Sequence, residues 1–147
     1  MTSTGSVVAC PACGTRNRVP QAGTGRVRCA SCHRDLPWLV DADDTTFDDA
    51  VVRSRLPVLV DVWAPWCGPC RQVAPVVEQL AAEHAGHLKV VKVNADEAPG
   101  VSARHGVTGI PTLLLYRDGA EASRTVGAAP ADQLRRWVAD GLAAVHD

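Results

Sequence analysis

Two cysteines separated by two residues, Cys67 and Cys70, directly follow an apolar run over residues 58–63 that has the composition of a buried strand. If a helix begins near Cys67, its unpaired N–H groups and the positive end of its dipole face the sulfur and favour the thiolate. The thiolate is the form that attacks disulfides, whereas a disulfide closed over two residues would add little to the stability of the fold. The spacing and context therefore predict a redox-active dithiol.

Four further cysteines form two more pairs of the same spacing near the start of the chain. Fifteen residues separate the pairs, which is the spacing of two zinc knuckles: Cys10 with Cys13, and Cys29 with Cys32. Four thiolates would complete a closed tetrahedral site with no open position, so we expect a structural zinc ion rather than a catalytic one. A segment of about 35 residues is too short to build its own core, and we expect it to depend on the metal for folding.

Other interpretations of these four cysteines remain open. Cys29, Cys32 and His33 match the attachment motif of a covalent haem, although that leaves the first pair unexplained. His33 could replace one cysteine as a ligand, but with four thiols present we expect it to be solvated or outside the ligand shell. The thiols could also bind nothing or form disulfides on oxidation. Binding of nucleic acid is disfavoured because residues 1–37 contain no aromatic side chain to stack on a base.

The 147-residue chain has the composition of a globular protein, with 46% hydrophobic and 21% charged residues, and room for one full-sized domain and a small one. Residues 1–37 hold five arginines and one aspartate, a formal charge of +4 that leaves −5 on the remainder. No apolar run reaches the ~18 residues of a membrane span, and the first residues do not resemble a signal peptide. We therefore expect a cytoplasmic protein without a membrane association, in which cysteines serve metal binding or catalysis.

Beyond Pro37 the sequence alternates between strand and helix patterns. Amphipathic periodicity, caps and turn residues predict a mixed sheet covered by helices on both faces, an α/β fold. The Asp118-Gly119 pair predicts a hairpin, and Pro75 predicts a kink within its helix. The predicted strands are 38–40, 57–63, 88–94, 112–117 and 121–126, and the predicted helices are 46–53, 68–84, 99–105 and 130–144.

Residues 38–146 resemble the thioredoxin family over nearly their whole length. The motifs that carry the resemblance occur in order: Asp44-x-x-Phe47, Val60-Asp61-x-Trp63-Ala64, Trp66-Cys67-Gly68-Pro69-Cys70, Pro75, Lys92-Val93-Asn94, Gly109-Ile110-Pro111-Thr112, Asp118-Gly119 and Gly127. With the four-cysteine segment in front, the chain resembles the zinc-binding, two-part members of the family called thioredoxin 2. The resemblance implies a zinc-ribbon-like domain over residues 1–37 and a thioredoxin domain over residues 38–147.

The resemblance also implies roles for individual residues. Cys67 would attack a substrate disulfide, and Cys70 would resolve the mixed disulfide. Asp61 interrupts an apolar strand, so burial should raise its pKa; the family implies that it accepts the proton of Cys70, with Lys92 as its charged partner. The substrate-binding residues implied by the family are Trp66, Gly68, Pro69, and the cis-proline turn of Ile110 and Pro111.

Gly68 and Pro69 between the cysteines are typical of the reducing members of the family, so the resemblance implies a protein-disulfide reductase. It implies thioredoxin reductase as the partner that supplies electrons from NADPH, disulfide-containing proteins as substrates, and a monomer. The alternatives are a zinc-dependent redox sensor or chaperone, and a disulfide oxidase or isomerase. The remaining histidines show no ligand spacing, and we expect them to be solvated: His84, His87, His105 and His146.

Overall fold

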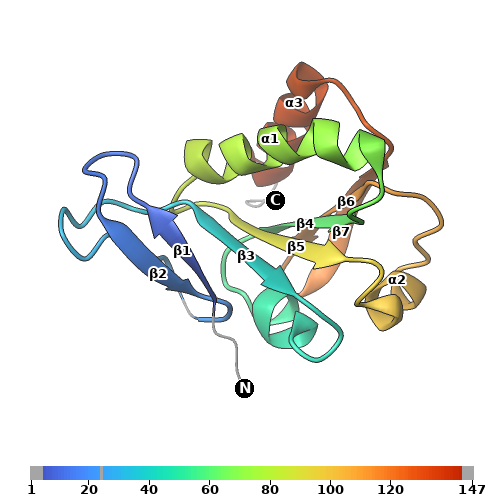
Figure 1. Ribbon diagram of the computed structural model, residues 1–147, viewed down its shortest axis with the longest axis horizontal. Coiled ribbons are helices and arrows are strands. Elements are labelled where there is room, and N and C mark those ends of the chain that lie inside the picture. Colours follow the sequence, from blue (N-terminus) through green and yellow to red (C-terminus); the bar gives the residue numbers. More distant parts are fainter. Residues whose placement is uncertain (1–4, 24, 144–147) are drawn as a thin grey trace.

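The computed structural model describes residues 5–23 and 25–143. Its centre is a five-stranded mixed sheet with the strand order β3-β5-β4-β6-β7 (Figure 1). Strands β3, β5 and β4 are parallel, whereas β6 is antiparallel to both β4 and β7. The bounds are Trp38–Ala42 for β3, Val58–Trp63 for β4, Lys89–Asn94 for β5, Thr112–Arg117 for β6 and Ala120–Val126 for β7. The predicted mixed sheet is confirmed.

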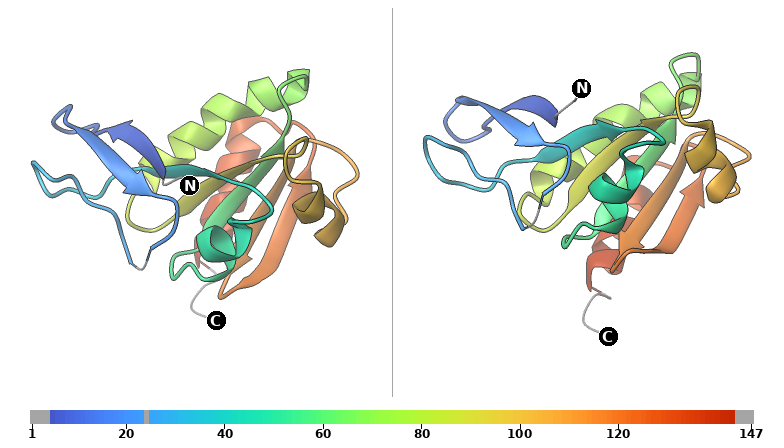
Figure 2. Two further views of the ribbon diagram at one scale, coloured as in Figure 1. Left: turned by 60° about the horizontal axis from the view of Figure 1, so that its bottom comes forward. Right: turned by 90° about the horizontal axis from the view of Figure 1, so that it is seen from below.

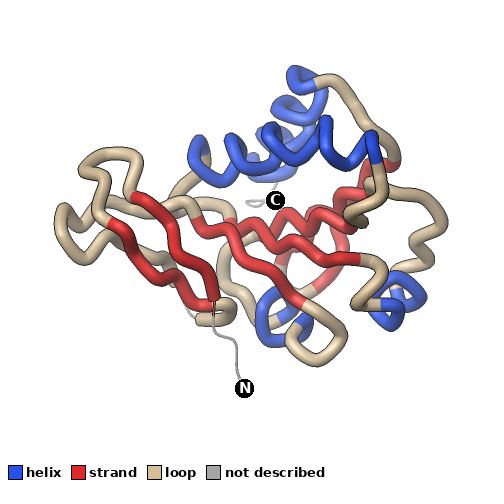
Figure 3. The backbone as a smooth tube through the Cα atoms, viewed as in Figure 1, coloured by secondary structure: helices blue, strands red, loops and turns tan. Residues whose placement is uncertain are grey.

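Helices cover both faces of this sheet, as the sequence predicts (Figures 1 and 3). Helices α1 (Gly68–Glu83) and α3 (Ala131–Ala143) lie on one face. The π-helix η1 (Asp48–Val52) and helix α2 (Pro99–Arg104) lie on the other face. Helix α1 continues through Pro75, whose missing N–H leaves one carbonyl of the preceding turn without its helical donor.

Strand β4 supplies side chains to two separate hydrophobic cores because successive residues of a strand point to opposite faces. Val58, Val60 and Val62 are buried in the core beneath η1 and α2. Leu59 is buried in the core beneath α1 and α3. Asp61 points to the same face of the sheet as Leu59, two residues before it. Its carboxyl group therefore lies on the face that α1 covers.

The segment between β3 and β4 differs from the prediction. Where we expected a regular helix over residues 46–53, the structure has the short π-helix η1. In the turn before it, the Oδ1 of Asp43 accepts the backbone N–H groups of Thr45 and Thr46 at 2.9 and 3.1 Å, whereas η1 itself has no side-chain cap. Asp44 instead accepts from the first residues of α2, which ties these two elements together.

The N-terminal segment forms a small antiparallel ribbon of strands β1 (Gly5–Ala9) and β2 (Arg16–Pro20), which packs beside the edge strand β3 (Figure 2). Cys10, Val19, Cys29 and Leu36 of this segment are buried in the same hydrophobic core as Trp38. The ribbon lies toward the end of α1 that is remote from Gly68 (Figure 1). The division into two domains at residue 37 remains a prediction.

None of the described helices is long and apolar enough to cross a lipid bilayer.

Candidate redox and metal sites

The reactive cysteine pair lies where β4 passes into α1. Cys67 is the N-cap residue of α1, and its Sγ accepts the backbone N–H of Cys70 at 3.2 Å. Cys67 and Cys70 form a disulfide with their Cα atoms 5.3 Å apart. The strand ends at Trp63 and the helix begins at Gly68, so the sulfur of Cys67 faces the positive end of the helix dipole. This is the arrangement that the sequence predicted for a reactive thiol.

Exposure does not distinguish the two cysteines in this oxidised form. Cys67 and Cys70 are 4% and 3% exposed. Ile110 packs against both cysteines. The cysteines differ in their surroundings: the Sγ of Cys67 lies 3.9 Å from the carbonyl oxygen of Ile110, whereas Cys70 lines a cavity together with Asp61.

The Ile110–Pro111 peptide bond is cis, as the family resemblance implied. The carbonyl oxygen of Ile110 lies 3.9 Å from the Sγ of Cys67, and the carbonyl of Pro111 accepts the N–H of Gly127 at 2.8 Å. Pro111 is buried and Ile110 is partly exposed. The carbonyl group of Ile110 therefore lies beside the disulfide.

Trp66 forms one wall of a groove beside the disulfide. Its ring is 66% exposed, and its indole N–H donates to the carboxylate of Asp96, 3.0 Å from Oδ2. The groove has a volume of about 350 Å³ and runs from Trp66 past Val107 to Ile110. An exposed tryptophan held by a hydrogen bond is a typical anchor of a binding surface. Gly68 and Pro69, between the two cysteines, are exposed.

Asp61 is 1% exposed, and burial raises the pKa of its carboxyl group to about 6, with the positive charge of Lys92 acting in the opposite direction. Its Oδ1 has no hydrogen-bond partner among the described residues. Asp61, Cys70 and Lys92 line one cavity of about 100 Å³, large enough for water. The structure thus brings together three of the residues that the sequence singled out, around a space through which a proton could pass.

The other four cysteines also come together. The Sγ atoms of Cys10, Cys13, Cys29 and Cys32 all lie within 4.8 Å of one another, with 3.6 Å between Cys10 and Cys32 and between Cys13 and Cys29. Four sulfurs bound to zinc at about 2.3 Å in a tetrahedron are separated by about 3.8 Å. The donor set and its spacing therefore fit a zinc ion.

The two knuckles have the same backbone geometry. The N–H of Cys10 donates to the carbonyl of Thr15, and the N–H of Cys29 donates to that of Arg34, both at 2.8 Å. Gly14 and His33 occupy equivalent positions with φ values of 80° and 68°. His33 is exposed and lies outside the cysteine cluster, so it is a turn residue rather than a ligand.

The thioredoxin family model matches residues 39–140, a range that contains the disulfide, Asp61, Lys92 and the cis-proline turn. The chain belongs to the thioredoxin family. It is 53% identical over 87 residues to "Thioredoxin 1" of Synechococcus elongatus, covering 59% of this chain and 81% of the relative. It is 47% identical over 96 residues to "Thioredoxin" of Haemophilus influenzae, covering 65% and 90%. It is 37% identical over 130 residues to "Thioredoxin M5, chloroplastic" of Oryza sativa, covering 88% and 75%.

Membership of the thioredoxin family makes the chain a thiol-disulfide oxidoreductase. The matched range begins after the four clustered cysteines near the start of the chain. The family match therefore bears on the dithiol, whereas the interpretation of the metal site rests on its own geometry.

Two residues of this thioredoxin have surroundings that the sequence interpretation missed. Lys89 is fully buried. It interrupts an apolar strand, as Asp61 does, and this pattern was the one signal in the sequence that could have indicated its burial. The prediction that His105 is solvated is wrong: its ring contacts Phe47, and its two nitrogens lie 2.8 Å from the carbonyl of Val101 and 2.5 Å from the hydroxyl of Tyr116. His146 lies outside the described residues.

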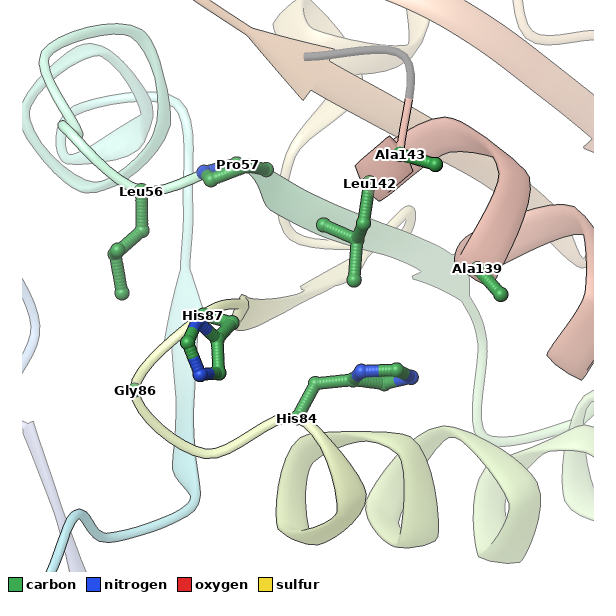
Figure 4. Close-up of a pocket in the computed structure, with 8 residues that line it drawn as sticks. All are labelled: Leu56, Pro57, His84, Gly86, His87, Ala139, Leu142 and Ala143. Carbon is green, nitrogen blue, oxygen red and sulfur yellow. The ribbon is translucent and has the colours of Figure 1, made fainter. Parts of the chain in front are cut away.

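A cavity at the opposite end of α1 is separate from the disulfide (Figure 4). It has a volume of about 460 Å³, lies between the end of α1, the start of β4 and the end of α3, and is mainly apolar. Among its lining residues are Leu56, His84, His87 and Leu142. No cysteine or carboxyl group lines it.

Proposed function

We propose that the chain reduces protein disulfides through Cys67 and Cys70 and holds one zinc ion with its N-terminal cysteines. The observation that carries the redox part is the position of the disulfide at the start of α1, between the cis-proline turn and the cavity that contains Asp61. A helix N-terminus supports the thiolate of Cys67, and the buried carboxyl group can exchange a proton near neutral pH.

In the proposed reaction, the Cys67 thiolate attacks one sulfur of the substrate disulfide and the other substrate sulfur leaves as a thiolate. Cys70 then attacks Cys67, which closes the Cys67–Cys70 disulfide and releases the second substrate thiol. Two electrons pass to the substrate and two protein thiols are oxidised. Asp61 accepts the proton of Cys70, with water in the shared cavity as the bridge and Lys92 as the charge that favours its carboxylate form.

The proposed substrate site surrounds the disulfide. An extended segment of the substrate would lie in the groove between Trp66 and Ile110, against exposed Gly68 and Pro69. The polar backbone of the turn at Pro111 would align it by main-chain hydrogen bonds. Such recognition favours exposed, locally extended disulfides over those buried in folded cores.

The proposed direction is reduction. Thioredoxins have potentials of roughly −270 mV, whereas strongly oxidising relatives lie near roughly −120 mV. We propose that a thioredoxin reductase returns the disulfide to the dithiol with electrons from NADPH. An oxidase or isomerase is the alternative, and a measured potential near the higher value would favour it.

The proposed zinc ion is structural. Cys10, Cys13, Cys29 and Cys32 would bind it, and the bound metal would supply folding energy to a segment with little core of its own. This arrangement supports assignment to the two-part, zinc-binding thioredoxins. Retention of four thiolates requires a reducing compartment, and we expect a cytoplasmic monomer. The alternative of a redox sensor or chaperone requires that oxidation releases the metal before the disulfide ceases to turn over.

Reduction of insulin by NADPH and a thioredoxin reductase tests the proposal. The intact chain should accelerate insulin precipitation and NADPH consumption, whereas C67S should do neither. As the matched control, R18M replaces an exposed residue far from the disulfide and should leave the rate unchanged. No reduction of insulin despite reduction of Cys67 and Cys70 by the reductase would contradict the proposed direction.

A further inference from the structure

Lys89 is a buried cation between the ribbon and the thioredoxin fold. It is the first residue of β5, is fully buried, and makes no ion pair with any described residue. Its Nζ instead donates to the carbonyl of Gln21 at 2.6 Å and to that of Ala50 at 2.7 Å, and lies 4.5 Å from the centre of the Trp38 ring. Burial lowers the pKa of Lys89 to about 8, which shows the cost of keeping the charge there.

The two carbonyl groups belong to different parts of the molecule. Gln21 follows β2 in the metal-binding segment, whereas Ala50 is part of η1 in the thioredoxin fold. A buried ammonium group that loses one acceptor must either find water or remain partly unsatisfied, and both outcomes destabilise the state around it. Lys89 therefore needs the ribbon in place.

Neighbouring contacts reinforce this junction. The indole N–H of Trp38 donates to the carbonyl of Pro20 at 2.8 Å, and the side chain of Gln21 donates to the carbonyl of Asp41 at 2.5 Å. Three hydrogen bonds thus connect two consecutive ribbon residues to β3 and β5. The cysteines of the ribbon lie at its knuckles and not at this junction, so the metal acts here only by keeping the ribbon folded.

We propose that Lys89 makes the stability of the thioredoxin fold depend on whether the ribbon holds its metal ion. Metal loss unfolds the ribbon, removes the carbonyl of Gln21 from the ammonium group, admits water to Lys89 and loosens β5 and η1. The inference rests on the proposed metal site. It adds a consequence for that site: the zinc ion stabilises the redox fold without approaching the disulfide.

Amine labelling tests whether the metal shields Lys89. The chain has only two lysines, Lys89 and Lys92, so an acylating reagent followed by peptide mass spectrometry reports on each. In the zinc-loaded chain with the Cys67–Cys70 disulfide intact, Lys89 should remain unlabelled. After removal of zinc by a chelator its labelling rate should rise about ten-fold or more, while that of half-buried Lys92 changes little.

Thermal unfolding of the full chain tests the role of the charge itself. All four tryptophans lie at or beyond residue 38, so their fluorescence reports on the thioredoxin fold. Zinc removal should lower the unfolding midpoint of the unmodified chain by about 5–10 °C. In K89M, which keeps the bulk but has no charge to solvate, the shift should be less than half as large. R18M removes an exposed cation of the ribbon and should retain the full shift.

The outcomes separate this inference from the proposed metal site. A chain that binds no zinc would overturn both. A chain that binds one zinc ion, yet shows equal Lys89 labelling with and without the metal, or the same midpoint shift in K89M as in the unmodified chain, would overturn only the role of Lys89.

Discussion

Asp61 and Lys92 are paired residues of the neighbouring parallel strands β4 and β5, yet their side chains form no ion pair within 4 Å. The ammonium group of Lys92 lies 5.0 Å from the centre of the Trp63 ring instead. Lys92 therefore stabilises the Asp61 carboxylate only at longer range, and burial prevails in setting its pKa. A closer ion pair would hold the carboxyl group ionised and make it a poorer proton acceptor near neutral pH.

The buried carboxyl group of Asp61 makes stability depend on pH. In the unfolded chain it releases its proton near the ordinary pKa of 3.8, and in the fold near 6, so the folded state binds the extra proton between these values. Stability should therefore fall as the pH rises from 4 to 6 and then level off. At pH 7.5 the free energy of unfolding of D61N should exceed that of the unmodified chain by up to about 3 kcal/mol, and this difference should vanish near pH 4. Urea unfolding of the oxidised forms at both pH values measures this.

The same substitution should slow the second half of the redox reaction. Because Asn cannot accept the proton of Cys70, release of the substrate from its mixed disulfide with Cys67 should slow by about ten-fold or more at pH 7. Stopped-flow mixing of the reduced protein with a peptide disulfide separates formation of the mixed disulfide from its decay. Equal decay rates in D61N and the unmodified chain would remove Asp61 from the proton path.

Much of the structure follows from local patterns, and the exceptions have identifiable physical causes. Strand β4 and helix α1 are marked by apolar periodicity, so the position of Cys67 was predictable. Burial of Lys89 was not, because its cover comes from Gln21, 68 residues away in the chain. His105 was misjudged for a similar reason: its hydrogen-bond partner Tyr116 lies on a strand beyond the cis-proline turn. Contacts between distant segments decide whether a polar residue is solvated, and local sequence does not encode them.

Asp96 should affect substrate binding through Trp66. D96A removes the acceptor of the indole N–H, so the exposed ring gains rotational freedom and the groove loses a fixed wall. The KM for a protein disulfide should rise roughly two- to five-fold with little change in kcat. E97A removes a neighbouring exposed carboxyl group and serves as the control. Equal KM values for D96A and E97A would show that the hydrogen bond does not shape the site.

A side chain at Gly141 should cost stability. A Cβ atom there would lie 2.0 Å from Cδ2 of Leu115, the end of a buried side chain that would have to shift. G141A gains helix propensity but forces the helix or Leu115 to shift, and we expect a net loss of about 1–3 kcal/mol in unfolding free energy. The matched change G68A enters open space at the start of α1 and should cost less than about 0.5 kcal/mol. Urea unfolding of both variants decides; a G141A at least as stable as G68A would contradict the close packing.

The central claim is that one of three cysteine pairs with the same spacing is redox-active, while the other two pairs bind a metal ion. Metal and thiol counts on the same sample test this claim most directly. The fully reduced protein should contain one zinc ion per chain and two rapidly titrating thiols. Mild oxidation by one equivalent of a small disulfide should consume those two thiols, place the new bond between Cys67 and Cys70, and leave the zinc bound. Loss of zinc in step with the first two thiols, or a first disulfide among Cys10, Cys13, Cys29 and Cys32, would contradict the account.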